Sequence, residues 1–179
     1  MTKFRYFAYG SNMLTERLKP RCRSAVAIGV AEVAGRAIEF SKRGEDRSGK
    51  ATLTESNRSA FGVVYEIDNA ELCELDTHEG KKGRGYYRDD HFAVTLADGS
   101  TIHAKTYLAS MPEDHLKPYD WYLALVIAGA REHNLDPEYV AGLCEVAYDV
   151  DHNASRPKRK DAIEALARAG FPDYRKLLL

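Results

Sequence analysis

Residues 6–13 read YFAYGSNM, an aromatic run that stops abruptly at a Gly-Ser-Asn turn. The aromatic residues of Lys3–Tyr9 predict a first β-strand, and Leu14–Leu18 predicts a short helix. A strand that breaks into small turn-forming residues this early marks Tyr9–Asn12 as a candidate binding loop.

The chemistry of that loop rests on its backbone. Consecutive N–H groups in a tight turn can form a concavity for a carboxylate or a developing oxyanion. Gly10 would let the chain adopt a conformation that other residues avoid and let a ligand approach closely. The alternative is an ordinary strand-to-helix turn capped by Ser11 or Asn12, which local spacing alone favours.

Strands dominate the first half of the chain and helices its last third, unlike the alternation of a doubly wound sheet. Expected strands are Ala25–Ser41 (one or two strands), Ala51–Thr54, Phe61–Ile67, His91–Leu96 and Thr101–Leu108, with turns at Ser56–Ser59 and Asp98-Gly99 and a polar loop at Ser41–Lys50. Expected helices are a capping-box helix from Asp68 and Glu71 to Gly80, Tyr119–Arg131, Pro137–Cys144 and Lys160–Ala169. This order predicts an α+β fold with a closed or nearly closed sheet.

Composition excludes several classes of function. The chain has 179 residues, 44% hydrophobic, with a formal net charge of −1, so no overall field attracts nucleic acid or an anionic membrane. No apolar run reaches membrane-spanning length, and the basic cluster Arg156–Lys160 is interpreted as a solvated tail. The three cysteines are widely spaced and form no CxxC, which predicts reduced thiols in a cytoplasmic protein. No metal-ligand spacing occurs among the six histidines.

Glu79 is the most informative titratable residue. It lies at the expected C-terminus of a helix, where the macrodipole is negative, and Asp76 lies one turn before it. Both features would raise the pKa of Glu79 and suit it to proton transfer near neutral pH. Lys81, Lys82 and Arg84 would lower it, and an exposed helix-end glutamate is the simpler alternative.

The Gly80–Gly85 segment, GKKGRG, has the composition of a phosphate cradle. It lacks the strand and the GK[ST] ending of a nucleotide loop, so we interpret it as a lid or a solvated loop.

Together these residues resemble the γ-glutamylcyclotransferase family. The matching stretches are FAYGSNMLTERL at Phe7–Leu18, FGVVYEI at Phe61–Ile67, ELDTHEG at Glu74–Gly80, TYL at Thr106–Leu108 and IAGAREHNL at Ile127–Leu135. The resemblance extends from about Phe4 to about Leu143.

The resemblance implies a small mixed β-barrel flanked by helices. We expect a γ-glutamylcyclotransferase-like catalytic domain over residues 1–150 and a basic tail with a short helix over 151–179, either part of the same domain or an accessory element. It implies release of 5-oxoproline from a γ-glutamyl amino acid without a cofactor, because the substrate's own α-amine attacks its γ-carbonyl. By the resemblance, Tyr9, Gly10, Ser11 and Asn12 bind the γ-glutamyl group through backbone N–H groups. Glu79 is then the general acid and base.

Three tyrosines are added to the substrate site by the same resemblance. They are Tyr107, Tyr122 and either Tyr86 or Tyr87, of which Tyr87 is preferred because it leads into the next strand. Ordinary core packing is the alternative for each.

The sequence leaves several questions open. Among the branches of the family that this chain resembles, the YGSN motif with Asn12 points to the branch that acts on free γ-glutamyl amino acids. A γ-glutamylamine, a biosynthetic γ-glutamyl intermediate and a non-catalytic small-molecule-binding protein are the alternatives. The tail from Glu145 matches nothing in the family, and a homodimer is expected only from the family's habit.

Overall fold

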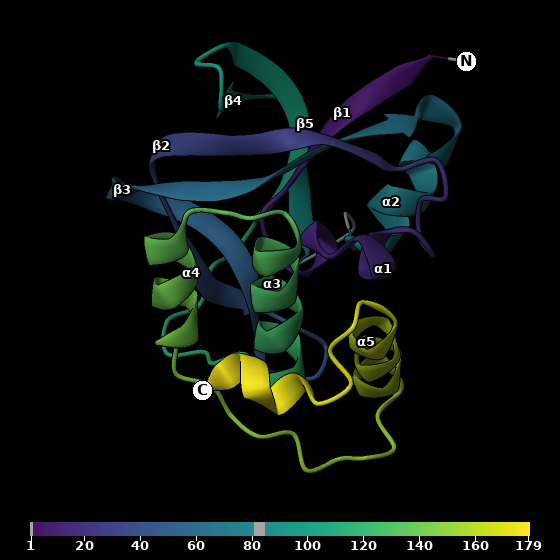
Figure 1. The fold of residues 1–179 in the computed structure, drawn as a ribbon, viewed down its shortest axis with the longest axis vertical. Coiled ribbons are helices and arrows are strands. Elements are labelled where there is room, and N and C mark those ends of the chain that lie inside the picture. Colours follow the sequence, from purple (N-terminus) through teal and green to yellow (C-terminus); the bar gives the residue numbers. More distant parts are fainter. Residues whose placement is uncertain (1, 81–84) are drawn as a thin grey trace.

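The structure is a computed structural model that describes residues 2–80 and 85–179. Five strands form a closed barrel in the order β1-β3-β2-β4-β5 (Figure 1). Their bounds are β1 Lys3–Ala8, β2 Val26–Arg43, β3 Gly49–Asp68, β4 Tyr86–Leu96 and β5 Thr101–Ala109. β1 pairs with β5 in parallel and the other pairs are antiparallel, which confirms the small mixed barrel.

The β2–β3 hairpin is longer than the sequence predicts. The expected turn at Ser56–Ser59 is wrong, because β3 runs without interruption from Gly49 to Asp68. Ala34 pairs with Ser59 and Arg36 with Glu55, so the polar residues 56–58 lie opposite Gly35 alone, which has a φ of 76°. They form a bulge rather than a turn, as polar residues at the exposed rim of a barrel often do. The hairpin turn lies within the polar 41–50 segment instead.

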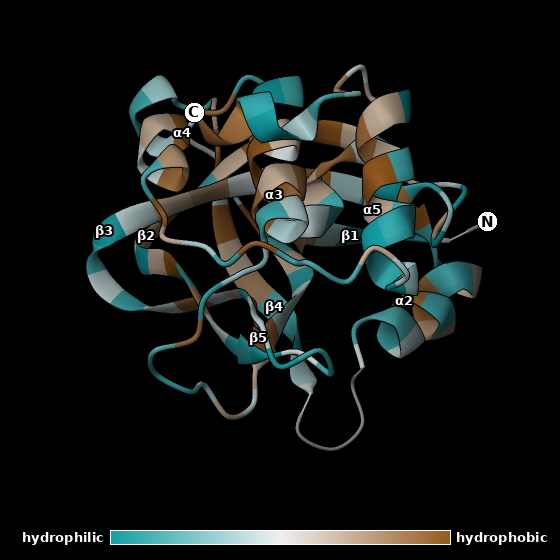
Figure 2. Cartoon of the chain, turned by 90° about the horizontal axis from the view of Figure 1, so that it is seen from below, coloured by the Kyte–Doolittle hydropathy of each residue, from teal (hydrophilic) through white to brown (hydrophobic). Residues whose placement is uncertain are grey.

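The helical layer covers one side of the barrel, with α3 between α4 and α5 (Figures 1 and 2). The helices of the described residues, in chain order, are η1 Ser11–Met13, α1 Thr15–Leu18, η2 Asn69–Glu71, α2 Leu72–His78, α3 Asp120–Glu132, α4 Pro137–Cys144, α5 Pro157–Arg168 and η3 Tyr174–Leu178. Every α3 residue from Asp120 to Ala130 is buried, as expected from its apolar composition. Gly129 allows close packing there, because a Cβ atom would lie 2.5 Å from the backbone nitrogen of Leu14.

Two helix signals have different outcomes. The α4 prediction is confirmed, and the Asp136 side chain accepts hydrogen bonds from the backbone N–H groups of Glu138 and Tyr139 as its cap. The capping box at Asp68 is wrong. The Asp68 side chain makes no cap hydrogen bond, and the Glu71 carboxylate instead accepts from the backbone N–H groups of Arg23 and Ser24.

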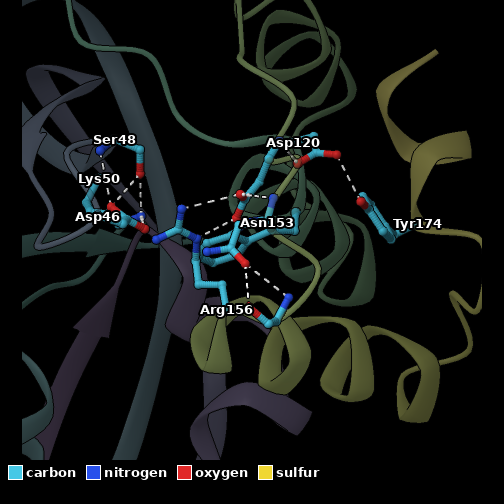
Figure 3. A network of polar contacts seen from close by, with 10 residues as sticks. Asp46, Ser48, Lys50, Asp120, Asn153, Arg156 and Tyr174 are labelled. Atoms are coloured by element: carbon cyan, nitrogen blue, oxygen red, sulfur yellow. Dashed lines mark hydrogen bonds and ion pairs between the residues drawn. The ribbon is translucent and has the colours of Figure 1, made fainter.

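The C-terminal segment packs on the helical layer. Ala162, Ala165 and Leu166 of α5 and Leu177 of η3 are buried in the same hydrophobic core as the barrel. The Tyr174 hydroxyl donates to the Asp120 carboxylate at 2.9 Å, within a polar network that continues to Arg156 (Figure 3). Residues beyond 150 therefore help to hold α3 in place. Among the described residues, no helix is long and apolar enough to cross a membrane.

Candidate active site

A cavity lies where β1 runs into η1, between the barrel and α3. Side chains and backbone from six parts of the chain line it: Tyr6, Tyr9, Gly10, Ser11, Asn12, Ala51, Glu79, Tyr86, Tyr107 and Tyr122. Of the eight residues that the sequence nominates, seven line this cavity, and only Tyr87 does not. The fold thus brings together a carboxyl group, a turn with backbone donors and a wall of tyrosines. Whether each contacts a substrate stays a prediction.

Glu79 follows the last turn of α2, and its carboxyl group is directed into the cavity. Its Oε1 atom accepts a hydrogen bond of 2.6 Å from the Asn12 amide and lies 3.6 Å from an Arg21 guanidinium nitrogen. Burial raises the pKa of Glu79 above its ordinary value, against the opposing effects of Arg21, Asn12, Arg17 and Lys42. A carboxyl group with a raised pKa can both take and return a proton near neutral pH.

The physical cause of that shift differs from the sequence argument. Loss of hydration, rather than Asp76, is the largest contribution to the raised pKa of Glu79. Asp76 is held by other partners, since its carboxylate accepts from Arg88 at 2.6 Å and from the Tyr107 hydroxyl at 2.7 Å. Gly80 ends the helix in the left-handed region, with a φ of 64°, as predicted. Lys81, Lys82 and Arg84, like most of the proposed lid, lie outside the described residues.

The loop opposite Glu79 is a single 3-10 turn at Ser11–Met13. The first N–H groups of a helical turn have no acceptor within it, and in the described part of the chain none is found for Ser11 or Asn12. Gly10 has a negative φ of −110°, so it is not needed here for a left-handed backbone. It is needed for space, because a Cβ atom at Gly10 would lie 3.1 Å from that of Ala51.

The side chain of Asn12 has a role that the sequence argument did not assign. Its amide nitrogen donates to Glu79 and, at 3.0 Å, to the Tyr6 hydroxyl, while its oxygen accepts from Arg21 at 3.0 Å. All the main hydrogen-bonding positions of the amide are therefore occupied by protein groups. Asn12 orients the carboxyl group of Glu79 and leaves only its backbone N–H for a ligand.

The tyrosine pair at the start of β4 requires a correction. Tyr87 is 50% exposed, whereas Tyr86 is buried, lines the cavity and donates its hydroxyl hydrogen to the Ala51 carbonyl at 2.7 Å. Successive side chains of a strand point to opposite faces, so only one of the two can face inward. The choice of Tyr87 as the pocket tyrosine is wrong, and Tyr86 takes its place.

The other predicted tyrosines are held by the surrounding backbone. Tyr122 accepts a hydrogen bond of 3.1 Å from the Ala51 N–H, and Tyr9 donates to the Tyr107 carbonyl. Burial raises the pKa of Tyr122 to about 12, so its hydroxyl group stays protonated at neutral pH. These contacts fix a rigid polar wall opposite the carboxyl group.

Sequence reasoning missed Tyr6, Ala51 and Arg21. Tyr6 lies an odd number of residues before Tyr9, so the period of two along a strand does not join it to the nominated loop. Ala51 and Arg21 had no local signal either. Within residues 2–80 and 85–179, no group of three or more His, Cys, Asp or Glu side chains is arranged to hold a metal ion.

The structure is thus a small closed barrel with a buried carboxyl group that faces a turn of backbone donors, an arrangement suited to proton transfer on a small polar molecule. Comparison with known proteins gives the family. The chain is 32% identical to γ-glutamylcyclotransferases of Bos taurus and Mus musculus in an alignment 173 residues long that covers 93% of this chain and 89% of each relative. The chain therefore belongs to the γ-glutamylcyclotransferase family.

Two further comparisons agree. A solved structure of a γ-glutamyl cyclotransferase superposes with a TM-score of 0.82 at 29% identity, over 91% of this chain and 99% of that one. The model of the AIG2-like family matches residues 59–143. The alignment with the Bos taurus relative covers 93% of this chain, more residues than Phe4–Leu143 contains, so it includes part of the tail. The expectation that the tail has no counterpart in the family is therefore wrong. The relatives' alignment continues into the segment that packs on α3.

Proposed function

We propose that this chain is a γ-glutamylcyclotransferase that releases 5-oxoproline and a free amino acid from γ-glutamyl amino acids. The observation that supports this most is the buried carboxyl group of Glu79, held by Asn12 and facing the backbone of η1. Membership of the family, whose curated relatives are named γ-glutamylcyclotransferases, gives the reaction class.

The reaction needs two proton transfers and no water. The free α-amine of the substrate attacks its own γ-carbonyl carbon, which forms the five-membered ring and a tetrahedral oxyanion. Glu79 takes the proton that the attacking nitrogen loses and delivers it to the leaving nitrogen. The bond between the γ-carbon and that nitrogen then breaks, the carbonyl re-forms, and Glu79 is a carboxylate again.

The site lowers the barrier mainly by positioning. Nucleophile and electrophile belong to one molecule, so much of the entropic cost is already met once the substrate is folded into a ring-closing shape. The N–H groups of Ser11 and Asn12 are the donors available to the γ-glutamyl group. Fixed tyrosine hydroxyls limit other conformations of the substrate. This assignment makes Glu79 the residue whose loss is most damaging.

The test compares two glutamates of the same helical region. Purified wild type, Glu79→Gln and Glu74→Gln are incubated with γ-Glu-Ala, and 5-oxoproline is measured by mass spectrometry. Glu74 is a matched control because its side chain is 67% exposed. We expect wild-type rates from Glu74→Gln and a loss of at least about a hundredfold from Glu79→Gln, the scale of general acid–base catalysis. An active Glu79→Gln protein would refute the assignment.

We further propose that the reaction takes place in the cytoplasm as part of glutathione-related metabolism. The free state of Cys22, Cys73 and Cys144 supports a reducing compartment. A homodimer stays a prediction from the family.

A further inference from the structure

Lys42 is a cation whose ammonium group lies against a residue of the cavity and makes no ion pair or hydrogen bond with the described residues 2–80 and 85–179. It lies near the end of β2, and its ammonium group is 5.0 Å from the centre of the Tyr86 ring, which lines the cavity. Among the described residues no carboxylate lies within 4.0 Å of it, although neighbouring lysines such as Lys50 and Lys158 form ion pairs. A half-buried ammonium group with no counter-ion among these residues keeps its three hydrogen-bond donors available for a ligand.

A second cation comes from the short helix that follows the binding loop. Arg17 belongs to α1, directly after the binding loop, and its Nε atom is buried without a hydrogen-bond partner. No carboxylate of the described chain lies within 4.0 Å of its guanidinium group, and burial lowers its pKa to about 10. Arg17, Arg21 and Lys42 are the cations whose fields oppose the raised pKa of Glu79. Three positive groups thus favour the charged form of one carboxyl group, and of these Arg21 lies 3.6 Å from it.

The position of these cations bears on the substrate classes that the sequence left open. A γ-glutamyl amino acid carries a carboxylate on its leaving group, and a γ-glutamylamine does not. The α-carboxylate of the glutamyl part is common to both and therefore cannot separate them. Only a cation that reaches the leaving group can do so. Lys42 contacts the ring of Tyr86 and is not itself among the residues that line the cavity.

We infer that Lys42 is a specificity-determining residue that binds the carboxylate of the leaving amino acid. This inference rests on the proposed function. The Tyr86 ring holds the lysine chain in place through a cation–π contact and leaves the donors of the ammonium group free for the ligand. Arg17 and Arg21 add to the attraction without contacting the leaving group.

The experiment uses two substrates that differ by one carboxylate. γ-Glu-Ala and γ-glutamyl-ethylamide have the same reacting atoms, and only the first has an anionic leaving group. Values of kcat/KM for 5-oxoproline release are compared for wild type, Lys42→Met, Lys42→Arg and Lys158→Met. Lys158→Met is the matched control, because it removes a nearby positive charge that is exposed and paired with Glu45 at 2.7 Å.

We expect wild type to prefer γ-Glu-Ala and Lys42→Met to lose roughly tenfold or more with that substrate alone, mainly through KM, as for a lost charge-assisted hydrogen bond. Lys42→Arg should retain most of the preference and Lys158→Met all of it. Equal losses with both substrates would mean that Lys42 only supports the fold, and an unchanged preference would also overturn the inference. Release of 5-oxoproline from neither substrate by wild type would instead contradict the proposed function.

Discussion

Removal of the Asp151 carboxylate tests whether the C-terminal segment stabilises the helix that presents Tyr122 to the cavity. Asp151 is buried, and its carboxylate accepts hydrogen bonds from the Trp121 indole at 2.9 Å and from the Arg156 guanidinium at 2.6 Å. These contacts belong to the network around Arg156 (Figure 3). Asp151→Ala would leave a buried indole N–H and a partly buried guanidinium group without their acceptor.

The expected cost follows from that geometry. Breaking a buried ion pair by removing one partner costs about 3–5 kcal/mol. The Arg156 side chain is 22% exposed and can recover some hydration, so we expect the lower end, about 3 kcal/mol. For a chain of this size that corresponds to a fall in Tm of roughly 6–12 °C.

Thermal unfolding followed by circular dichroism at pH 7 measures the effect, with Asp173→Ala as the control. Asp173 is exposed and pairs with Lys176 at 3.5 Å, so its loss should change stability by no more than about 0.5 kcal/mol. Hydrogen bonds from Arg156 and Trp121 hold the pKa of Asp151 below its ordinary value against the effect of burial. Its contribution is therefore present above the unfolded pKa and lost as pH falls through the folded one, so the difference between wild type and Asp151→Ala should shrink below about pH 4. A Tm of Asp151→Ala within 2 °C of wild type at pH 7 would refute the stabilising role of the Asp151 carboxylate.

Three further predictions concern the cavity and its support. Burial raises the pKa of Glu79, so its charge destabilises the fold as pH rises through the folded pKa. By calorimetry, Glu79→Gln should have a higher Tm than wild type at pH 8 and the same Tm near pH 4. A lower Tm of the variant at pH 8 would contradict this. Tyr86→Phe should reduce kcat/KM about tenfold or more, because it leaves the buried Ala51 carbonyl without its hydrogen bond. Tyr87→Phe should match wild type in the same assay. Equal effects of the two variants would be incompatible with Tyr86 alone lining the cavity. Gly129→Ala should lower the free energy of unfolding in urea by about 1–3 kcal/mol, because the new Cβ would overlap the backbone of Leu14. An unchanged free energy of unfolding would mean that α3 and Leu14 are less closely packed than this.

The sequence predicted the fold class and most helices because their signals are local. The buried α3 has a continuous apolar run, and the α4 boundary has a capping aspartate followed by proline. The β2–β3 hairpin was underestimated for the opposite reason. Residues 56–58 have turn chemistry, and only their pairing opposite Gly35 in the closed barrel makes them a bulge.

Site residues could be predicted where a residue type within a motif determines the chemistry. They could not be predicted where the chemistry depends on burial or on the direction of a side chain. Glu79 was nominated from its place at a helix end, but the burial that raises its pKa comes from tertiary packing. Tyr86 and Tyr87 are equivalent in sequence, and only the pairing of β4 decides which one faces inward. Lys42 had no sequence signal at all, because its contact with Tyr86 joins β2 and β4, which are far apart along the sequence.

In the proposed mechanism the substrate's own amine, rather than water, attacks the γ-carbonyl. Turnover of γ-Glu-Ala in water enriched in oxygen-18, with products analysed by mass spectrometry, separates the two nucleophiles. Cyclisation predicts unlabelled 5-oxoproline and alanine in equal amounts, with no glutamate formed. Glutamate bearing one oxygen-18 atom in its γ-carboxylate would show hydrolysis and contradict the mechanism.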